Sequence, residues 1–114
     1  MMSVTIYHNP RCSKSRKTLE LIQDKGVEPE IVEYLQTPPS ADELKDILKK
    51  LGKSASEIVR KKEAKEEGID VGALDNDALI EALSAHPRAI ERPIVVKGGK
   101  AVMGRPPENV DDLL

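Results

Sequence analysis

Two short β-prone runs in the last quarter of the chain are separated by nothing more than a pair of glycines. The runs are Pro93–Lys97 and Lys100–Met103, with Gly98 and Gly99 between them. A two-residue loop of residues that tolerate positive φ is typical of a tight β-hairpin. The sequence therefore predicts an antiparallel strand pair here, and any fold proposed for the chain must contain it.

The first third of the chain predicts a strand, a helix and a second strand. Val4–Tyr7 is a β-rich run that ends at the breakers Asn9 and Pro10, and Ser13–Lys25 has apolar residues at helical spacing. Glu30–Leu35 is another β-prone run. A strand, a helix and a strand in this order favour a parallel pair joined by a right-handed crossover.

Four further segments have helical patterns. Two of them open on Ser-x-x-Glu capping boxes, and one is stopped by a proline, which disfavours helical conformation in the residue before it. The predicted helices run from Ser40 to the stop at Gly52, from Ser54 through Val59, over Asn76–Ala85 and over residues 106–114. The order β-α-β, helices, β-β-α predicts an α/β fold in which helices cover a four-stranded mixed sheet.

Length and composition exclude several kinds of protein. With 114 residues the chain is expected to form one domain. A net charge of -2 and only two aromatic residues argue against nucleic acid as a partner, which would need a basic surface or stacking platforms. No apolar run is long enough to span a bilayer and no signal-peptide pattern is present, so we expect a cytoplasmic protein with no membrane partner.

Cys12 is the only cysteine, and the chain has two histidines. This set cannot form a structural zinc site or an internal disulfide, so no metal is expected and a second thiol must come from outside. Cys12 lies at the predicted strand-to-helix junction, where backbone amides and the helix dipole stabilise a thiolate. With the nearby cations Arg11, Lys14 and Arg16, we expect a thiol pKa of roughly 3.5 to 7.5 in place of about 8.5.

The residues around Cys12 narrow the chemistry further. Ser15 stands where a Cys-x-x-Cys oxidoreductase has its second sulfur, so it can donate a hydrogen bond to a thiolate but cannot form a disulfide. Thr18 stands where the Cys-x5-Arg loop of a cysteine phosphatase needs arginine. Arginines that bind an oxyanion must therefore come from elsewhere, and Arg92 and Arg105, at predicted strand ends, are candidates. A free cysteine can also be a small buried hydrophobe, but the polar context here favours reactivity.

Several motifs in chain order carry a family resemblance: Tyr7–Leu19, Pro38–Ser40, Ile58–Lys61, His86–Pro87 and Glu91–Val96. Together they resemble the glutaredoxin-coupled arsenate reductases of the ArsC type, essentially end to end. The resemblance implies a thioredoxin-like fold, as a single domain over residues 1–114 with a helical insertion at about 40–90. It also makes Pro93 similar to the cis-proline of such folds, although the sequence leaves the isomer open.

The resemblance also implies an activity and its residues. Cys12 would attack arsenate or a similar oxyanion. Glutathione would be the co-substrate and glutaredoxin the protein partner, with no metal and no bound cofactor. The implied site residues are Cys12 as nucleophile, His8 and Ser15 as supports of the thiolate, and Arg60, Arg92 and Arg105 as oxyanion ligands.

Two alternative functions stay open from the sequence. Arg11 and Ser13-Lys14 stand where arsenic-resistance members usually have a small residue and Gly-Thr, so the same thiol could act on glutathione mixed disulfides or another oxidant. The second alternative is a non-enzymatic redox regulator that binds RNA polymerase, because ArsC-like folds also occur in that role. Those relatives carry a Cys-x-x-Cys switch, which Ser15 removes here.

Overall fold

The computed structural model describes residues 4–91, 93–104 and 107–114. The described residues form two compact units. The first unit combines the described parts of 1–37 and 92–114, and the second covers 38–91. The assignment of the whole chain to a single domain with an insertion at about 40–90 stays a prediction.

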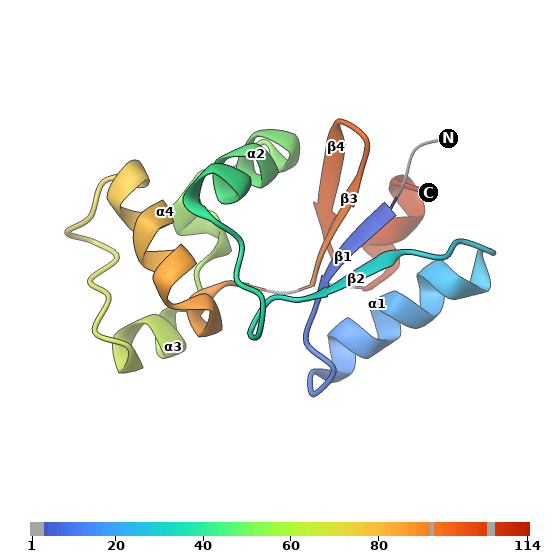
Figure 1. The fold of residues 1–114 in the computed structure, drawn as a ribbon, viewed down its shortest axis with the longest axis horizontal. Helices are drawn as coiled ribbons and strands as arrows, with labels where there is room; N and C mark the ends of the chain where they lie inside the picture. The colour runs from blue at the N-terminus through green and yellow to red at the C-terminus, as the bar shows by residue number, and fades with distance from the viewer. Residues whose placement is uncertain (1–3, 92, 105–106) are drawn as a thin grey trace. The chain divides into compact units, whose positions relative to one another are not determined.

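A four-stranded mixed sheet forms the centre of the first unit (Figure 1). Its strands are β1 (Val4–His8), β2 (Glu30–Glu33), β3 (Ile94–Lys97) and β4 (Lys100–Met103), in the spatial order β2-β1-β3-β4. β1 pairs parallel with β2 and antiparallel with β3, and β3 pairs antiparallel with β4. The predicted mixed sheet is confirmed, and so is the hairpin: Lys97 pairs with Lys100, and Gly98 has a φ of 59°.

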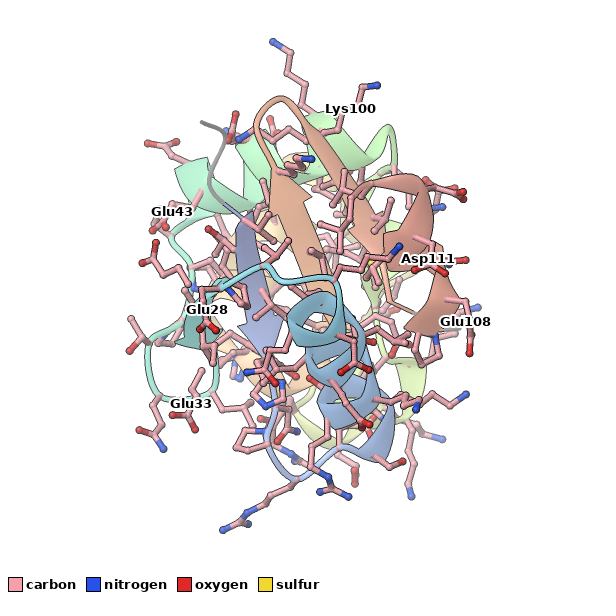
Figure 2. All side chains as sticks on the ribbon, turned by 90° about the vertical axis from the view of Figure 1, so that its right-hand side faces the viewer. Glu28, Glu33, Glu43, Lys100, Glu108 and Asp111 are labelled. Carbon is pink, nitrogen blue, oxygen red and sulfur yellow. The ribbon has the colours of Figure 1, made fainter. Side chains whose placement is uncertain are left out.

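One face of this sheet is covered by α1 (Ser13–Asp24) and by the 3-10 helix η3 (Pro107–Asp112), which lie together in front of the strands in Figure 2. Side chains from β1, β3, α1 and η3 meet in one apolar core. Its buried members are Val4, Ile6, Ile22, Val95 and Val110. The core fixes α1 on the sheet, and α1 begins directly after Cys12.

The second unit is helical. It contains α2 (Ala41–Leu51), η1 (Ala55–Ile58), α3 (Lys61–Glu66), α4 (Asn76–Ala85) and η2 (Pro87–Ala89). The capping box predicted at the start of α2 is present: the Glu43 amide donates to Ser40 Oγ at 3.2 Å, and the Ser40 amide donates to Glu43 Oε1 at 3.1 Å. α4 has the predicted bounds, and its apolar side chains Leu79, Ile80 and Leu83 are buried.

Four predicted elements differ from the structure in their bounds or type. β2 ends at Glu33 and does not continue to Leu35, because the amides of Gln36 and Thr37 both donate to the Glu33 carbonyl at 2.9 Å and form a turn. The short helix after Ser54 is a 3-10 turn that stops at Ile58. Val59 has extended backbone and forms an isolated β-bridge with Ile90.

The C-terminal helix is also of the 3-10 type and ends at Asp112, within the predicted range of 106–114. β3 begins at Ile94 and not at Pro93. Proline has no amide hydrogen to donate to a strand partner, which limits it to strand ends. The Pro93 carbonyl still accepts from the Gly104 amide at 2.8 Å, so the backbones beyond the two strands remain paired.

Candidate functional site

The candidate nucleophile lies in a short segment that we call the thiol turn, residues 8–15. The Cys12 amide donates to the Asn9 carbonyl at 3.0 Å, and the Arg11 amide donates to Asn9 Oδ1 at 3.0 Å. Cys12 is half-buried and is the N-cap residue of α1, with extended φ and ψ of -93° and 123°. Asn9 therefore closes the turn that delivers the thiol to the start of the helix.

Ser15 connects the two sides of the thiol turn. Its side chain is fully buried, and its Oγ accepts a hydrogen bond from the Asn9 amide at 3.0 Å. The same oxygen lies 2.6 Å from His8 Nδ1. His8 ends β1 and Ser15 lies in the first turn of α1, so this buried pair joins the strand to the helix at the point where Cys12 sits between them.

His8 is 5% exposed, and its burial lowers the pKa of the imidazole below its usual 6.5. The Glu33 carboxylate acts in the opposite direction, and the Arg16 guanidinium lowers the pKa further. Burial is the largest of these effects. The imidazole is therefore neutral at neutral pH, with one ring nitrogen as donor and the other as acceptor.

The start of α1 leaves backbone donors available to an anion. The first amide that donates within the helix is that of Arg16, which binds the Cys12 carbonyl at 3.0 Å. The earlier amides of a helix have no intrahelical acceptor and carry the positive end of the dipole. Arg16 also donates from Nη1 to the Pro10 carbonyl at 2.9 Å, which places its charge over the thiol turn.

A second close contact ties the ends of the hairpin to α1. The Thr18 hydroxyl lies 2.8 Å from the Lys14 carbonyl and 3.2 Å from the Gly104 carbonyl. A Cβ added at Gly104 would lie 2.6 Å from Pro93 Cγ and 2.7 Å from Thr18 Oγ1. Only glycine fits between these two side chains, so the backbone next to Arg105 is held against the helix that follows Cys12.

Arg60 belongs to the second unit, where it is the N-cap residue of α3. Its amide donates to the Ala89 carbonyl at 2.7 Å. Its guanidinium Nε lies 3.4 Å from Glu63 Oε2, and both side chains are largely buried, at 22% and 17% exposed. The arginine is thus paired with a carboxylate in its own unit.

The predicted site residues fall into three groups. His8, Cys12 and Ser15 lie together in the thiol turn, whereas Arg60 is placed within the other unit. Arg92 and Arg105 lie outside the described residues, as does the Arg92–Pro93 peptide bond whose isomer was left open. The convergence of the three arginines on Cys12 stays a prediction.

Four residues of this region were not identified from the sequence. Asn9 and Thr18 lie within the Tyr7–Leu19 motif that carries the resemblance, but the sequence assigns neither a role in the site: Asn9 is expected to break a strand, and Thr18 to exclude a phosphatase loop. Glu63 stands three residues after Arg60, a spacing typical of helical ion pairs, and this signal was available. The close packing at Gly104 had no local signal, because its partner Thr18 is 86 residues away.

Two further findings concern ions and membranes. Among the described residues, no group of three or more His, Cys, Asp or Glu side chains is placed to hold a metal ion. Over the same ranges, no helix combines the length and apolar character that crossing a membrane requires.

The mixed sheet with a cysteine at the start of its first helix defines a thiol protein of the thioredoxin-like class. The sequence profile of the ArsC family matches residues 7–113, and the chain belongs to this family. It is 51% identical over 117 residues to an arsenate reductase of Neisseria meningitidis serogroup A, with all of both chains covered.

Two more comparisons agree with this assignment. The chain is 54% identical to the uncharacterized protein YfgD of Escherichia coli K12, with 97% of this chain and 96% of that protein covered. The solved structure of an arsenate reductase from Vibrio cholerae superposes with a TM-score of 0.93 at 47% identity, covering 99% of this chain and 98% of the other. The predicted family and thioredoxin-like fold are confirmed.

Proposed function

We propose that the chain is an arsenate reductase in which the Cys12 thiolate attacks arsenic(V). The observation that carries this proposal is the match along the whole chain to proteins named arsenate reductases. The thiol turn supports it, because a cysteine at a helix N-terminus beside backbone amides and Arg16 has the surroundings that favour a thiolate.

The atoms and electrons of the proposed reaction balance with thiols as the only reductants. Condensation of the Cys12 thiol with arsenate forms a sulfur–arsenic bond and releases water, with arsenic still in the +5 state. A second condensation, with glutathione, adds another sulfur and releases another water. A glutaredoxin thiolate then attacks the glutathione sulfur, forms a mixed disulfide and leaves the electron pair on arsenic(III). Water finally displaces Cys12 and releases arsenite.

Arg60, Arg92 and Arg105 are the proposed ligands of the arsenate oxygens. A guanidinium offers parallel N–H donors that match two oxygens of a tetrahedral oxyanion. The pairing of Arg60 with Glu63 supports this role in one respect, because it holds the guanidinium through Nε in a partly buried position.

Ser15 is the proposed donor to the Cys12 thiolate. Its other hydrogen bonds determine whether its hydroxyl hydrogen is free to point at the sulfur. Ser15 has one hydroxyl hydrogen and already accepts from the Asn9 amide. If His8 Nδ1 carries the imidazole proton and donates to Ser15 Oγ, the hydroxyl hydrogen is left to point at the sulfur. We therefore assign the Nδ1–H tautomer to His8 in the working enzyme.

Steady-state arsenate reduction in the presence of glutathione and glutaredoxin tests the proposal. Cys12→Ser should reduce turnover to that of the glutathione-only blank, while Ser13→Ala, an exposed change at the first residue of α1, should retain it. Unchanged turnover in Cys12→Ser would remove the thiol from the mechanism. If wild-type turnover of arsenate equals the blank while the protein reduces glutathionylated protein, then glutathione mixed disulfides and not arsenate are the substrate.

A further inference from the structure

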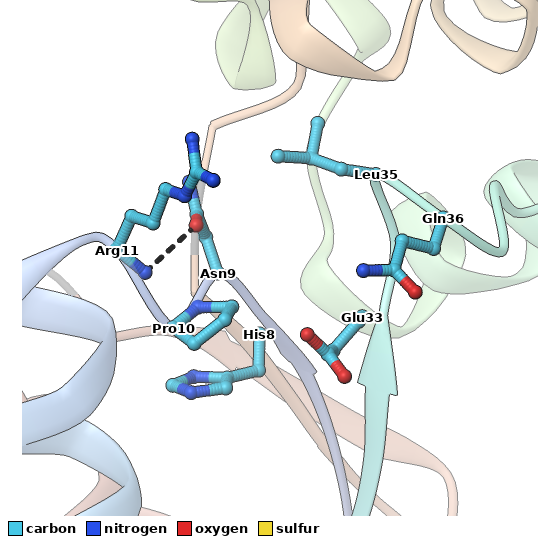
Figure 3. Close-up of a pocket in the computed structure, with 7 residues that line it drawn as sticks. All are labelled: His8, Asn9, Pro10, Arg11, Glu33, Leu35 and Gln36. Atoms are coloured by element: carbon cyan, nitrogen blue, oxygen red, sulfur yellow. Dashed lines mark hydrogen bonds between the residues drawn. The ribbon is translucent and has the colours of Figure 1, made fainter.

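An open pocket of about 230 Å³ lies against the thiol turn, within the first unit (Figure 3). One wall comes from the residues after β1 and includes Arg11. The other comes from the end of β2 and includes Glu33, Leu35 and Gln36. The first wall belongs to the thiol turn that also contains Cys12, because Cys12 directly follows Arg11 and its amide donates to the Asn9 carbonyl.

The parallel pairing of β1 and β2 explains why a pocket forms here. His8 and Glu33 are partners at the ends of the two strands, so both chains leave the sheet at the same edge. The carboxyl ends of parallel strands are where ligands bind in open α/β sheets. Hydrogen bonds to Asn9 Oδ1 on one side and to the Glu33 carbonyl on the other fix the two walls.

The walls carry opposite charges that do not neutralise each other. Arg11 and Glu33 both line the pocket and are exposed, yet neither forms an ion pair with the other or with any residue in the described ranges. A pocket for a simple anion would not place a carboxylate on one wall. Separate positive and negative groups instead match a ligand that itself carries separate negative and positive groups.

We propose that this pocket binds the thiol co-substrate of the reaction, a small zwitterionic thiol peptide such as glutathione. The inference rests on the proposed function. Arg11 would bind a ligand carboxylate, and Glu33 the ligand ammonium group. Gln36 supplies an amide that can pair with a peptide bond, and Leu35, 39% exposed, offers apolar contact to methylene groups. A thiol held here lies against the turn that presents Cys12.

Occupation of the pocket precedes the second condensation. In that step the glutathione sulfur bonds to arsenic, one arsenic hydroxyl leaves as water with the thiol proton, and no electrons are transferred. The pocket therefore acts on the capture of glutathione and not on the first reaction between Cys12 and arsenate. This separation allows the two to be measured independently.

Titration of the intact protein with S-methylglutathione, which cannot react, tests binding directly by nuclear magnetic resonance. The backbone amides of Asn9, Arg11, Glu33, Leu35 and Gln36 should shift in a saturable manner by about 10 mM ligand, the range of a millimolar site. Shifts confined to other residues, or none at all, would overturn the assignment of the pocket.

Kinetics provide a second test with matched controls. Glu33→Gln and Arg11→Gln should each raise the KM for glutathione by about 2- to 5-fold, as expected for exposed charge contacts, and the double variant by about 10-fold. Glu30→Gln on the same strand and Lys17→Gln on α1 should not raise it. The KM for 2-mercaptoethanol, which has no charged groups, should not rise in Glu33→Gln or Arg11→Gln relative to the two control variants.

The outcomes separate this inference from the proposed function. If arsenate is not reduced while S-methylglutathione shifts the pocket amides and Glu33→Gln weakens those shifts, the pocket assignment stands and the arsenate reductase assignment fails. If arsenate is reduced while the pocket amides do not shift and the glutathione KM is the same in Glu33→Gln and Glu30→Gln, the pocket assignment fails and the reductase assignment stands.

Discussion

Cys12 and Arg60 occupy the same local position in two different settings. Each is the residue that precedes a helix, with extended backbone angles of -93° and 123° for Cys12 and -85° and 100° for Arg60. The thiol turn that contains Cys12 also holds a buried serine and a buried histidine of lowered pKa. The neighbour of Arg60 is a carboxylate at 3.4 Å.

The difference between the two settings matches the proposed roles of the two groups, which are nucleophilic attack by the Cys12 thiolate and oxyanion binding by the Arg60 guanidinium. Within the thiol turn, the hydrogen bonds of His8, Asn9 and Ser15 join uncharged groups, and Arg16 donates to a backbone carbonyl, so no carboxylate is paired with that cation there. Glu63 balances the charge of a partly buried arginine, which would be costly to leave without a partner. An arriving oxyanion would compete with a carboxylate for Arg60, whereas at Cys12 it would meet amides and a sulfur.

The largest effect is expected at Arg60. Arg60→Lys keeps the positive charge but loses the planar arrangement of donors, so the KM for arsenate should rise about 10- to 100-fold, as expected for lost hydrogen bonds between charged groups. Arg88→Lys is the control, because Arg88 is an exposed arginine of the same unit that pairs with Glu66 at 3.5 Å. Equal arsenate KM values in the two variants would show that Arg60 does not bind the substrate.

Substitution of Ser15 should destabilise the thiol turn. Ser15→Ala leaves the buried Asn9 amide and His8 Nδ1 without their partner, which should lower the free energy of unfolding by about 1–3 kcal/mol. The pH at which Cys12 becomes reactive toward iodoacetamide should also rise, because the thiolate would lose its proposed donor. Ser13→Ala changes an exposed serine of the same helix turn and should alter neither quantity.

The third prediction concerns Gly104, which packs closely against Pro93 and Thr18. Gly104→Ala forces a Cβ to within 2.6 Å of Pro93 Cγ, and such overpacking should cost about 1–3 kcal/mol of unfolding free energy. Gly99→Ala is the matched control, since a Cβ there meets nothing within 4 Å. Urea unfolding followed by circular dichroism measures both, and an equal, small loss would argue that the contact with Thr18 is not tight.

The smallest effect is the pH dependence that His8 contributes to stability. Because folding lowers the pKa of His8, the unfolded state binds more protons as the pH falls through 6.5, and the folded state loses stability there. The slope is at most about 1.4 kcal/mol per pH unit. It should disappear in His8→Gln and persist in His86→Gln. A free energy of unfolding independent of pH in the wild type between neutrality and the lowered pKa would contradict the burial of a neutral imidazole.

Local signals predicted most of the fold. The Ser40 capping box, the two-glycine hairpin and the bounds of α4 all follow from a few adjacent residues, and the structure has them as predicted. The errors occur where competing local hydrogen bonds decide the conformation, as at the Glu33 carbonyl, which accepts two turn amides and ends β2 early.

The candidate site was predicted to a smaller extent. The placement of Cys12 before a helix follows from the breakers at Asn9 and Pro10, and it agrees with the structure. The contacts of Thr18 with Gly104 and of His8 with Ser15 depend on how strands and helix pack, and no spacing rule indicates them. The roles assigned to Cys12, Ser15, His8, Arg60, Arg92 and Arg105 remain predictions for experiment.

Alkylation of Cys12 in the presence of arsenate tests the central claim most directly. The chain has one cysteine, so intact-protein mass spectrometry reports its reaction with iodoacetamide without ambiguity. Arsenate, compared with potassium chloride at equal ionic strength, should slow alkylation in a saturable manner, because oxyanion and reagent compete for one thiolate. The same rate of alkylation at every arsenate concentration would contradict the assignment of Cys12 as the group that attacks arsenate.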